Sequence, residues 1–368
     1  MYAYNDEWKI LVSIAKGDVL KVKEILNSNC LNWGELIEQS MRHKMFPMVC
    51  HEFLKDDELF SRVPPFINQY FKICYDINSV KTRIIKNEAI EIDKLLEERN
   101  IPCVATKGII LDNLLYENGG YRFLSDVDFM TLPQFKNDVA NALGSLSFQV
   151  GTVDWRYNCV REMDREEYLR YVLSKDKLPE HVKRIENSII KYVSVGFVSS
   201  FTWEKCEYTV DMEEAFRSVC RVAIDEKGNT IRSLGIAYHF IYIILHLYKH
   251  AWVEFLSKWN NDVNLVKFAD VYRYWNLNKK ILINEMPDLM RYLKIEEPVL
   301  WTLHHTDQVF GSHILCDLNC ESFSRDKCIY INSASDSAGK VRYWKGDMMG
   351  RLFSKNREQL FFNKCEEI

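Results

Sequence analysis

Apolar residues recur at helical spacing through the first part of the chain. Between residues 6 and 60 they fall into short runs, which predict short amphipathic helices, one of them capped by Asn32. After Pro65, steps of three and four residues lay one apolar stripe along a helix that we expect to reach Arg99. The pattern therefore predicts an entirely helical section over residues 1–98. The stripe consists of Phe66, Tyr70, Ile73, Ile77, Val80 and Ile84.

The pattern changes after residue 100. The run IPCVAT (101–106) is compact, apolar and bounded by turn residues, which is typical of a buried strand. A short amphipathic helix follows and ends at Gly119-Gly120, where left-handed backbone is free of strain. The alternating segment FLSDVDFMTL (123–132) predicts a second strand, and Pro133 opens another helix that runs to about Leu146. The predicted order is strand, turn, helix, strand, helix.

The rest of the chain carries two more strand-like runs and two more helices. Residues 161–184 are highly charged and predict an exposed helical insertion. The strand-like runs are KYVSVGFV (191–198) and CEYTVDM (206–212), and helices are expected over 237–252 and 255–275. We therefore expect an α+β fold with a small mixed β-sheet. The expected sections are a helical N-terminal section (1–98), the sheet core (99–232), a helical C-terminal domain (233–310) and an extension without a predicted structure (311–368).

Composition and charge narrow the classes of protein. Of 368 residues, 47% are apolar and 27% charged, an ordinary globular balance, and the low counts of 14 Gly and 8 Pro disfavour all-β or disordered architectures. The net charge of −4 gives no general attraction to polyanions, which disfavours a nucleic-acid partner. The stretch 236–252 is too short to span a bilayer, so no membrane partner is expected. The 11 cysteines and the absence of a secretory signal predict free thiols in the cytoplasm.

Two carboxylates stand two residues apart on the second predicted strand. Because strand side chains alternate, Asp126 and Asp128 project from one face while Val127 enters the other. Mg²⁺ is usually held by one or two carboxylates together with substrate phosphates, which this geometry leaves room for. The alternative is that both are solvated surface acids, since such a pair is common by chance.

The turn before these acids has features of a phosphate site. The first strand delivers Lys107 and Gly108 to the start of a helix, whose unpaired amides and dipole favour anions. Gly108 would let a phosphate approach the backbone, and Lys107 would supply a charge. Arg122 could bind phosphate as a fork. The alternatives are a surface turn for the first two residues and an ordinary charge at the beginning of a strand for Arg122.

Asp211 is the third candidate acid. Within EYTVDM it would point with Thr209 to the side opposite Val210, on an adjacent strand that brings it beside Asp126 and Asp128. A charge among apolar neighbours needs a cation or a metal. The alternative is a salt bridge with Arg217 or Arg221.

These residues together resemble a known family. Thr106-Lys107-Gly108 with a following leucine and tyrosine, then G-G-Y-R-x3-D-V-D (119–128), then a distant V-D, is similar to the uncharacterised nucleotidyltransferase family of the DNA polymerase beta-like superfamily. The resemblance covers about residues 30 to 275. The sequence departs from the family where the usual V-D-L-H-W is replaced by V-D-M-E-E (210–214), which keeps the acid and loses the histidine and the aromatic residue.

The resemblance implies a metal-dependent nucleotidyltransferase that uses a nucleoside triphosphate such as ATP. Mg²⁺ or Mn²⁺ would be held by Asp126, Asp128 and Asp211, and Lys107, Gly108 and Arg122 would bind phosphate. The nucleotide would pass to a hydroxyl, phosphate or amine of a small-molecule or peptide acceptor. One alternative is an enzyme that modifies proteins, as in toxin–antitoxin systems of the superfamily. Another is a catalytically silent nucleotide-binding module.

Three features near the later helices have two interpretations each. Asp262 stands where the resemblance places a nucleotide-site acid, or bonds to a neighbouring side chain. A stripe of His239, His246 and His250 borders the nucleotide cleft or lies in a helix interface. The last feature is a group of histidines and cysteines, which is either a zinc site or a set of ordinary thiols. Its members are His304, His305, His313, Cys316, Cys320 and Cys328.

Overall fold

The computed structural model describes residues 5–28, 30–116, 119–174, 176–203, 206–253, 257, 260–320, 328–335 and 339–362. The chain folds into two compact units. The sheet unit comprises Phe53–Lys55 and Phe60–His239, and the helical unit comprises Met1–Glu52, Asp56–Leu59 and Phe240–Ile368. The four sections expected along the sequence stay a prediction, because the units are defined by packing and one of them joins both ends of the chain.

The N-terminal part is helical, as predicted. Asn32 begins α3, and its side chain accepts a hydrogen bond from the backbone amide of Glu35 at 3.1 Å, which confirms the predicted cap. The long helix α6 spans Pro65–Glu98 and so ends within one residue of the expected position. The shorter helices are α1 (Asp6–Lys16), α2 (Val19–Ser28), α3 (Trp33–Arg42), α4 (Phe46–Lys55) and α5 (Asp57–Arg62).

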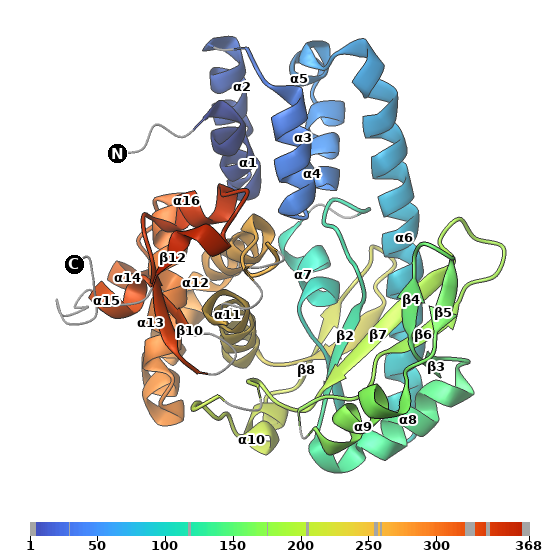
Figure 1. Ribbon diagram of the computed structural model, residues 1–368. Coiled ribbons are helices and arrows are strands. Elements are labelled where there is room, and N and C mark those ends of the chain that lie inside the picture. The colour runs from blue at the N-terminus through green and yellow to red at the C-terminus, as the bar shows by residue number, and fades with distance from the viewer. Residues whose placement is uncertain are drawn as a thin grey trace. The chain divides into compact units, whose positions relative to one another are not determined.

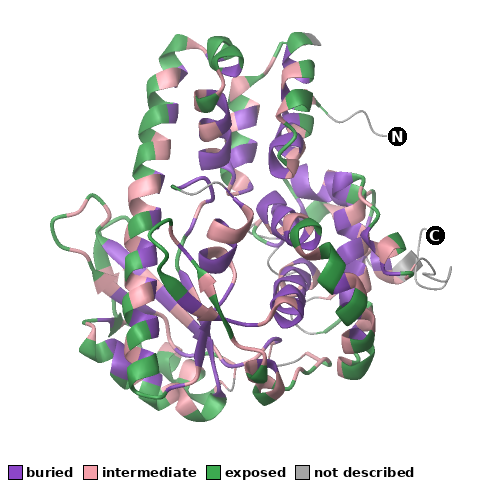
Figure 2. Ribbon diagram, turned by 180° about the vertical axis from the view of Figure 1, so that it is seen from behind, coloured by how far each residue is buried: buried purple, intermediate pink, exposed green. Residues whose placement is uncertain are grey.

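The apolar stripe predicted along α6 is not its buried face. Phe66 and Tyr70 are 73% and 61% exposed, whereas their neighbours Ile67 and Phe71 are buried. Phe71 packs against the ring of Phe53, at a centroid distance of 6.2 Å. Consecutive residues of a helix point about 100° apart, so two adjacent apolar faces are distinguished only by what packs on them. Figure 2 shows exposed positions along α6 beside the buried strands.

A mixed sheet forms the centre of the sheet unit (Figure 1), which confirms the α+β expectation. Its strand order is β3-β6-β7-β2-β1-β9-β8. The neighbours β2 and β7 run parallel, as do β1 and β9, while the other neighbours are antiparallel. The strands are β1 (Cys103–Ala105), β2 (Val127–Thr131), β3 (Gln149–Val150), β6 (His181–Arg184), β7 (Tyr192–Val198), β8 (Cys220–Ala223) and β9 (Thr230–Ser233).

Helices α6 and α8 (Lys136–Ser145) cover one face of this sheet. Val127 and Phe129 of β2 point into the core that α6 and α8 build, and so does Val195 of β7. The alternate residues of β2 and β7 therefore point to the other face. The remaining elements of the unit are α7 (Gly108–Leu115), η1 (Pro133–Phe135), the hairpin of β4 (Thr152–Asp154) and β5 (Cys159–Arg161), α9 (Arg165–Leu173) and α10 (Met212–Arg217).

The helical unit contains the C-terminal elements. The predicted helix 237–252 is confirmed as α11 (Ile236–Trp252), whose first turn belongs to the sheet unit. The helix expected from residue 255 begins only at Leu265, where Asn264 caps α12. In the described ranges, no helix is both long and apolar enough to cross a membrane. The other elements are α12 (Leu265–Leu293), α13 (Glu296–Phe310), α14 (Ile314–Asp317), α15 (Cys328–Ile331), β10 (Ser333–Ser335), β11 (Val341–Trp344), α16 (Met348–Phe353), η4 (Glu358–Leu360) and β12 (Phe361–Phe362).

Candidate functional site

Asp126 and Asp128 lie at the beginning of β2, on the face of the sheet away from α6 and α8. Asp126 directly precedes the strand and is exposed, and its Oδ1 accepts a hydrogen bond from Ser125 Oγ at 2.6 Å. The side chain of Asp128 is 24% exposed. Val127 between them is fully buried in the core, which fixes the direction of both acids by strand alternation.

Lys107 forms an ion pair with Asp128. Its Nζ lies 3.0 Å from Asp128 Oδ1, at the point where β1 gives way to α7. Burial raises the pKa of Asp128; Lys107 lowers it, but Asp126 adds to the rise, and the pKa stays above its ordinary value. The pair of carboxylates is therefore only partly neutralised by the lysine. A further cation beside them would lower the free energy of their ionised form.

The backbone of Lys107 is strained. Its φ of 51° and ψ of −129° lie in a region that residues with a side chain rarely adopt. We expect Lys107→Gly to be more stable than Lys107→Ala by about 1 kcal/mol, because both remove the ammonium and only glycine relieves the strain. Urea unfolding of the two variants measures the difference. The reverse order, which is usual for Gly and Ala elsewhere, would show that the conformation is not held in solution.

Arg122 packs directly on Gly108. A Cβ at residue 108 would lie 2.6 Å from Arg122 Nη1, so only glycine lets the guanidinium approach the first turn of α7. Arg122 also lowers the pKa of Asp128 through its charge. The loop that carries it is held by Asn78 of α6, whose Nδ2 donates to the carbonyls of Gly120 and Arg122 at 2.6 and 3.2 Å. The residues that lie together here are thus Lys107, Gly108, Arg122, Asp126 and Asp128. No sequence pattern pointed to Asn78.

The strand beside β2 carries no acid on this face. In the parallel pairing Asp128 stands opposite Gly196 of β7, and by the same register Asp126 stands opposite Ser194. Glu180 directly precedes β6, the next strand of the sheet. Burial raises the pKa of Glu180, Ser194 lowers it, and the charges of Asp126 and Asp128 raise it further. No sequence pattern singled out this acid, because Glu180 lies in the charged segment (161–184) that predicts an exposed helical insertion.

Asp211 does not lie on a strand, so that prediction is wrong. Residues 206–211 have no regular structure, and Asp211 is the N-cap of α10. Its exposed carboxylate accepts hydrogen bonds from the amides of Glu213 and Glu214 at 2.9 and 3.3 Å. The acidic residues that replace the histidine and aromatic residue therefore begin a helix, which turns the chain away from the sheet ladder. A catalytic role of Asp211 stays a prediction.

Asp262 is the centre of a buried ion-pair cluster in the helical unit. It precedes α12 rather than lying on it, and its side chain is fully buried. Asp262 Oδ1 lies 2.6 Å from Arg357 Nη1, and Oδ2 lies 3.0 Å from Arg351 Nη2. Burial raises the pKa of Asp262, but the two guanidinium groups outweigh it and lower the pKa. Both oxygens of the carboxylate are thus paired with arginines. This agrees with the second interpretation of Asp262, in which the acid bonds to neighbouring side chains.

His239 supports the Lys107 turn. Its Nε2 accepts a hydrogen bond from the backbone amide of Lys107 at 3.3 Å, and its Nδ1 lies 3.5 Å from Ser233 Oγ. Burial lowers the pKa of His239 to about 4, so the ring is neutral at pH 7 and can accept at Nε2. His246 and His250 contact each other in the helical unit, with ring centroids 4.5 Å apart.

Two metal sites are predicted from the sequence, a zinc site among the histidines and cysteines of residues 304–328 and a magnesium or manganese site at Asp126 and Asp128. Within the residues that the structure describes, no three His, Cys, Asp or Glu side chains gather as a metal site; the side chain of Cys328 lies outside them. His305 is buried, and its Nε2 contacts the carbonyl of Ile331 at 3.0 Å. Asp126 and Asp128 suit Mg²⁺ or Mn²⁺ better, since they offer oxygen ligands that already attract the cation of Lys107.

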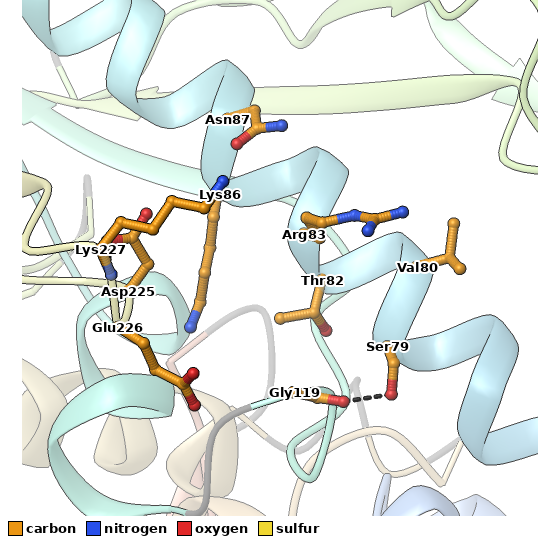
Figure 3. A pocket seen from close by; sticks show the side chains of 10 residues that line it. All are labelled: Ser79, Val80, Thr82, Arg83, Lys86, Asn87, Gly119, Asp225, Glu226 and Lys227. Atoms are coloured by element: carbon orange, nitrogen blue, oxygen red, sulfur yellow. Dashed lines mark hydrogen bonds between the residues drawn. The ribbon is translucent and has the colours of Figure 1, made fainter.

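A separate cavity of about 400 Å³ opens beside α6. Its lining includes Thr82, Arg83 and Lys86 of α6 on one side and residues 225–227 on the other (Figure 3). Lys86 is paired with the buried Asp112 of α7 at 2.7 Å. The cavity contains none of the residues predicted to bind nucleotide or metal.

Comparison with known proteins identifies the family. Residues 29–311 match the family described as uncharacterised nucleotidyltransferase. Among solved structures, an antigenic nucleotidyltransferase-like protein from Paracoccidioides brasiliensis is similar at 12% identity and a TM-score of 0.29, over 57% of this chain and 92% of that chain. No curated protein matches. Because the family match spans most of the 368 residues, the chain belongs to the uncharacterised nucleotidyltransferase family.

Proposed function

We propose that the chain is a metal-dependent nucleotidyltransferase that moves a nucleoside monophosphate from a nucleoside triphosphate to a hydroxyl, phosphate or amine of a small molecule or peptide. Family membership supports the class of reaction. The single observation that carries the assignment of the site is the Lys107–Asp128 ion pair. It joins a cation that suits phosphate to a carboxylate that suits a metal, at the beginning of a helix.

The roles of the residues follow from their positions. Asp126 and Asp128 hold Mg²⁺ or Mn²⁺, which supplies charge neutralisation for the triphosphate. Lys107 exchanges its contact with Asp128 for a phosphate oxygen, and Arg122 stabilises the charge that develops on the leaving pyrophosphate. Gly108 and the amides of the first turn of α7 accommodate a phosphate. In this proposal, Asp262 serves stability rather than nucleotide binding, because two buried arginines occupy it.

The test is consumption of triphosphate. Purified protein is incubated with Mg²⁺ and each of ATP, GTP, CTP and UTP, together with a metabolite extract as acceptor, and pyrophosphate release is measured. We expect release with at least one triphosphate and its loss on chelation by EDTA. A triphosphate at 100 times its dissociation constant should also stabilise the fold by about 2.7 kcal/mol.

Two other results would redirect the proposal. Stabilisation by a triphosphate without pyrophosphate release, whatever acceptor is offered, identifies a silent nucleotide-binding module. A nucleotide adduct on a protein, detected by intact-mass spectrometry, identifies a protein-modifying enzyme of the toxin–antitoxin type. Absence of both binding and release contradicts the proposed function.

A further inference from the structure

A third acid lies on the same face of the sheet as the Asp126–Asp128 pair. Asp128 stands opposite Gly196, and the residues that precede β6 lie on the other side of Gly196. Glu180 directly precedes β6 and is half-buried. Both aspartates raise the pKa of Glu180 through their charge. The three carboxylates therefore interact across three neighbouring strands.

Strand alternation directs Glu180 to this face, because the next residue, His181, pairs with Val195, whose side chain enters the core. His181 pairs with Val195, whereas Lys177 pairs with Val198, so the chain before β6 has one residue more than β7 between these pairings. Leu178 and His181 are buried, and the extra residue leaves Pro179 and Glu180 together opposite Gly196. The bulge therefore lets both Leu178 and His181 be buried while Glu180 stays on the face of Asp128.

We propose that Glu180 is the third carboxylate of the divalent-cation site, in the place that the sequence predicts for Asp211. The proposal rests on the proposed function, because it concerns the ion that the nucleotidyl transfer requires. Gly196 places no side chain between Asp128 and Glu180, and a Cβ at residue 196 would lie 3.7 Å from Asp128 Oδ1.

The spacing suits an ion. Neighbouring strands lie about 4.8 Å apart, so the backbones of Asp128 and Glu180 are separated by about 9.6 Å. An ion with oxygen ligands at about 2.1 Å draws two carboxylates to within roughly 4 Å of each other, which side chains reaching over a glycine can achieve. In the structure Asp128 contacts Lys107, and among the described residues no three such side chains are gathered as a metal cluster.

The test measures cation binding without nucleotide. Mn²⁺ is titrated into the full chain and followed by electron paramagnetic resonance of the free ion. We expect Glu180→Gln to weaken Mn²⁺ binding at least about 10-fold. The matched control is Glu186→Gln, which removes the same charge at the other end of β6, where Glu186 pairs with Arg184 at 3.1 Å on the surface. This control should stay within about twofold of the unaltered protein.

A rescue variant tests whether Glu180→Gln loses Mn²⁺ affinity because a carboxylate is missing or because the fold is disturbed. Ser194→Asp, combined with Glu180→Gln, puts a carboxylate opposite Asp126 on the strand beside it, and should restore most of the lost Mn²⁺ affinity. Should Glu180→Gln not fold, Glu180→Asp keeps the charge and shortens the side chain by one methylene group. We expect the same loss of Mn²⁺ affinity from that variant, since its carboxylate no longer reaches over Gly196.

The outcomes distinguish this inference from the proposed function. If Asp128→Asn loses Mn²⁺ binding while Glu180→Gln or Glu180→Asp keeps it within twofold, Glu180 is not a ligand and the metal site itself stands. Failure of Ser194→Asp to restore binding also contradicts the inference. If the unaltered protein neither binds Mn²⁺ nor consumes a triphosphate, the proposed function and the inference both fail.

Discussion

Asp128→Asn should lower the rate of pyrophosphate release at least about 100-fold. The amide offers one weak oxygen ligand in place of a carboxylate, and it leaves the ammonium of Lys107 without its partner at 3.0 Å. We expect the free energy of unfolding to change by no more than about 1 kcal/mol, because the ion pair is partly exposed to solvent. Steady-state pyrophosphate release and urea unfolding of the same preparation measure both quantities.

The matched control for this variant is Asp138→Asn. Asp138 is an exposed acid in the first turn of α8, within the same sheet unit, and α8 covers the face opposite the candidate site. It should retain the full rate. A folded Asp128→Asn variant that keeps more than half of the rate would show that Asp128 does not bind the ion.

Asp262→Asn should destabilise the helical unit by about 3–5 kcal/mol. Two guanidinium groups, of Arg351 and Arg357, are fully buried against this carboxylate and would become uncompensated buried charges. Both also bind backbone carbonyls, of Ala251 and Val263 among others, so they cannot swing out to water without breaking those bonds. Urea unfolding followed by tryptophan fluorescence measures the loss.

The control is an ion pair of the same chemistry on the surface. Asp76 pairs with Lys72 on α6 at 2.6 Å, and both side chains are more than half exposed. Asp76→Asn should change the free energy of unfolding by about 0–1 kcal/mol. Equal effects of the two variants would mean that the buried cluster is open to solvent in the protein itself.

Local features of this fold follow from the sequence. The alternation around Val127 predicts β2 and the face on which Asp128 lies, because a strand has only two faces. Asn32 and the prolines at the start of α6 mark helix boundaries, because capping and the fixed φ of proline act over a few residues. The turn at Lys107-Gly108 also follows from nearby residues, because Arg122, which packs on Gly108, comes only 14 residues later in the chain.

Features that depend on long-range packing do not follow from the sequence. Two apolar faces of α6 compete, and the sheet decides which of them is buried. The run around Asp211 has the alternation of a strand, yet its acids begin α10, since helix capping competes with the ladder. Glu180 reaches the site because β7, which pairs with β6, also pairs with β2 from much earlier in the chain, and no local pattern signals that long-range pairing.

The helical unit joins segments that are synthesised far apart in time, residues 1–52 and 240–368. Arg273 of α12 donates to the carbonyl of Ala15 in α1 at 2.8 Å, and Lys16 donates to the carbonyl of Phe310 at 3.0 Å. Helix α1 is therefore synthesised before these partners, which follow more than two hundred residues later. Meanwhile the whole sheet unit is translated and can fold. Nascent chains that stall before α12 would expose the apolar side of α1 and become substrates for chaperones.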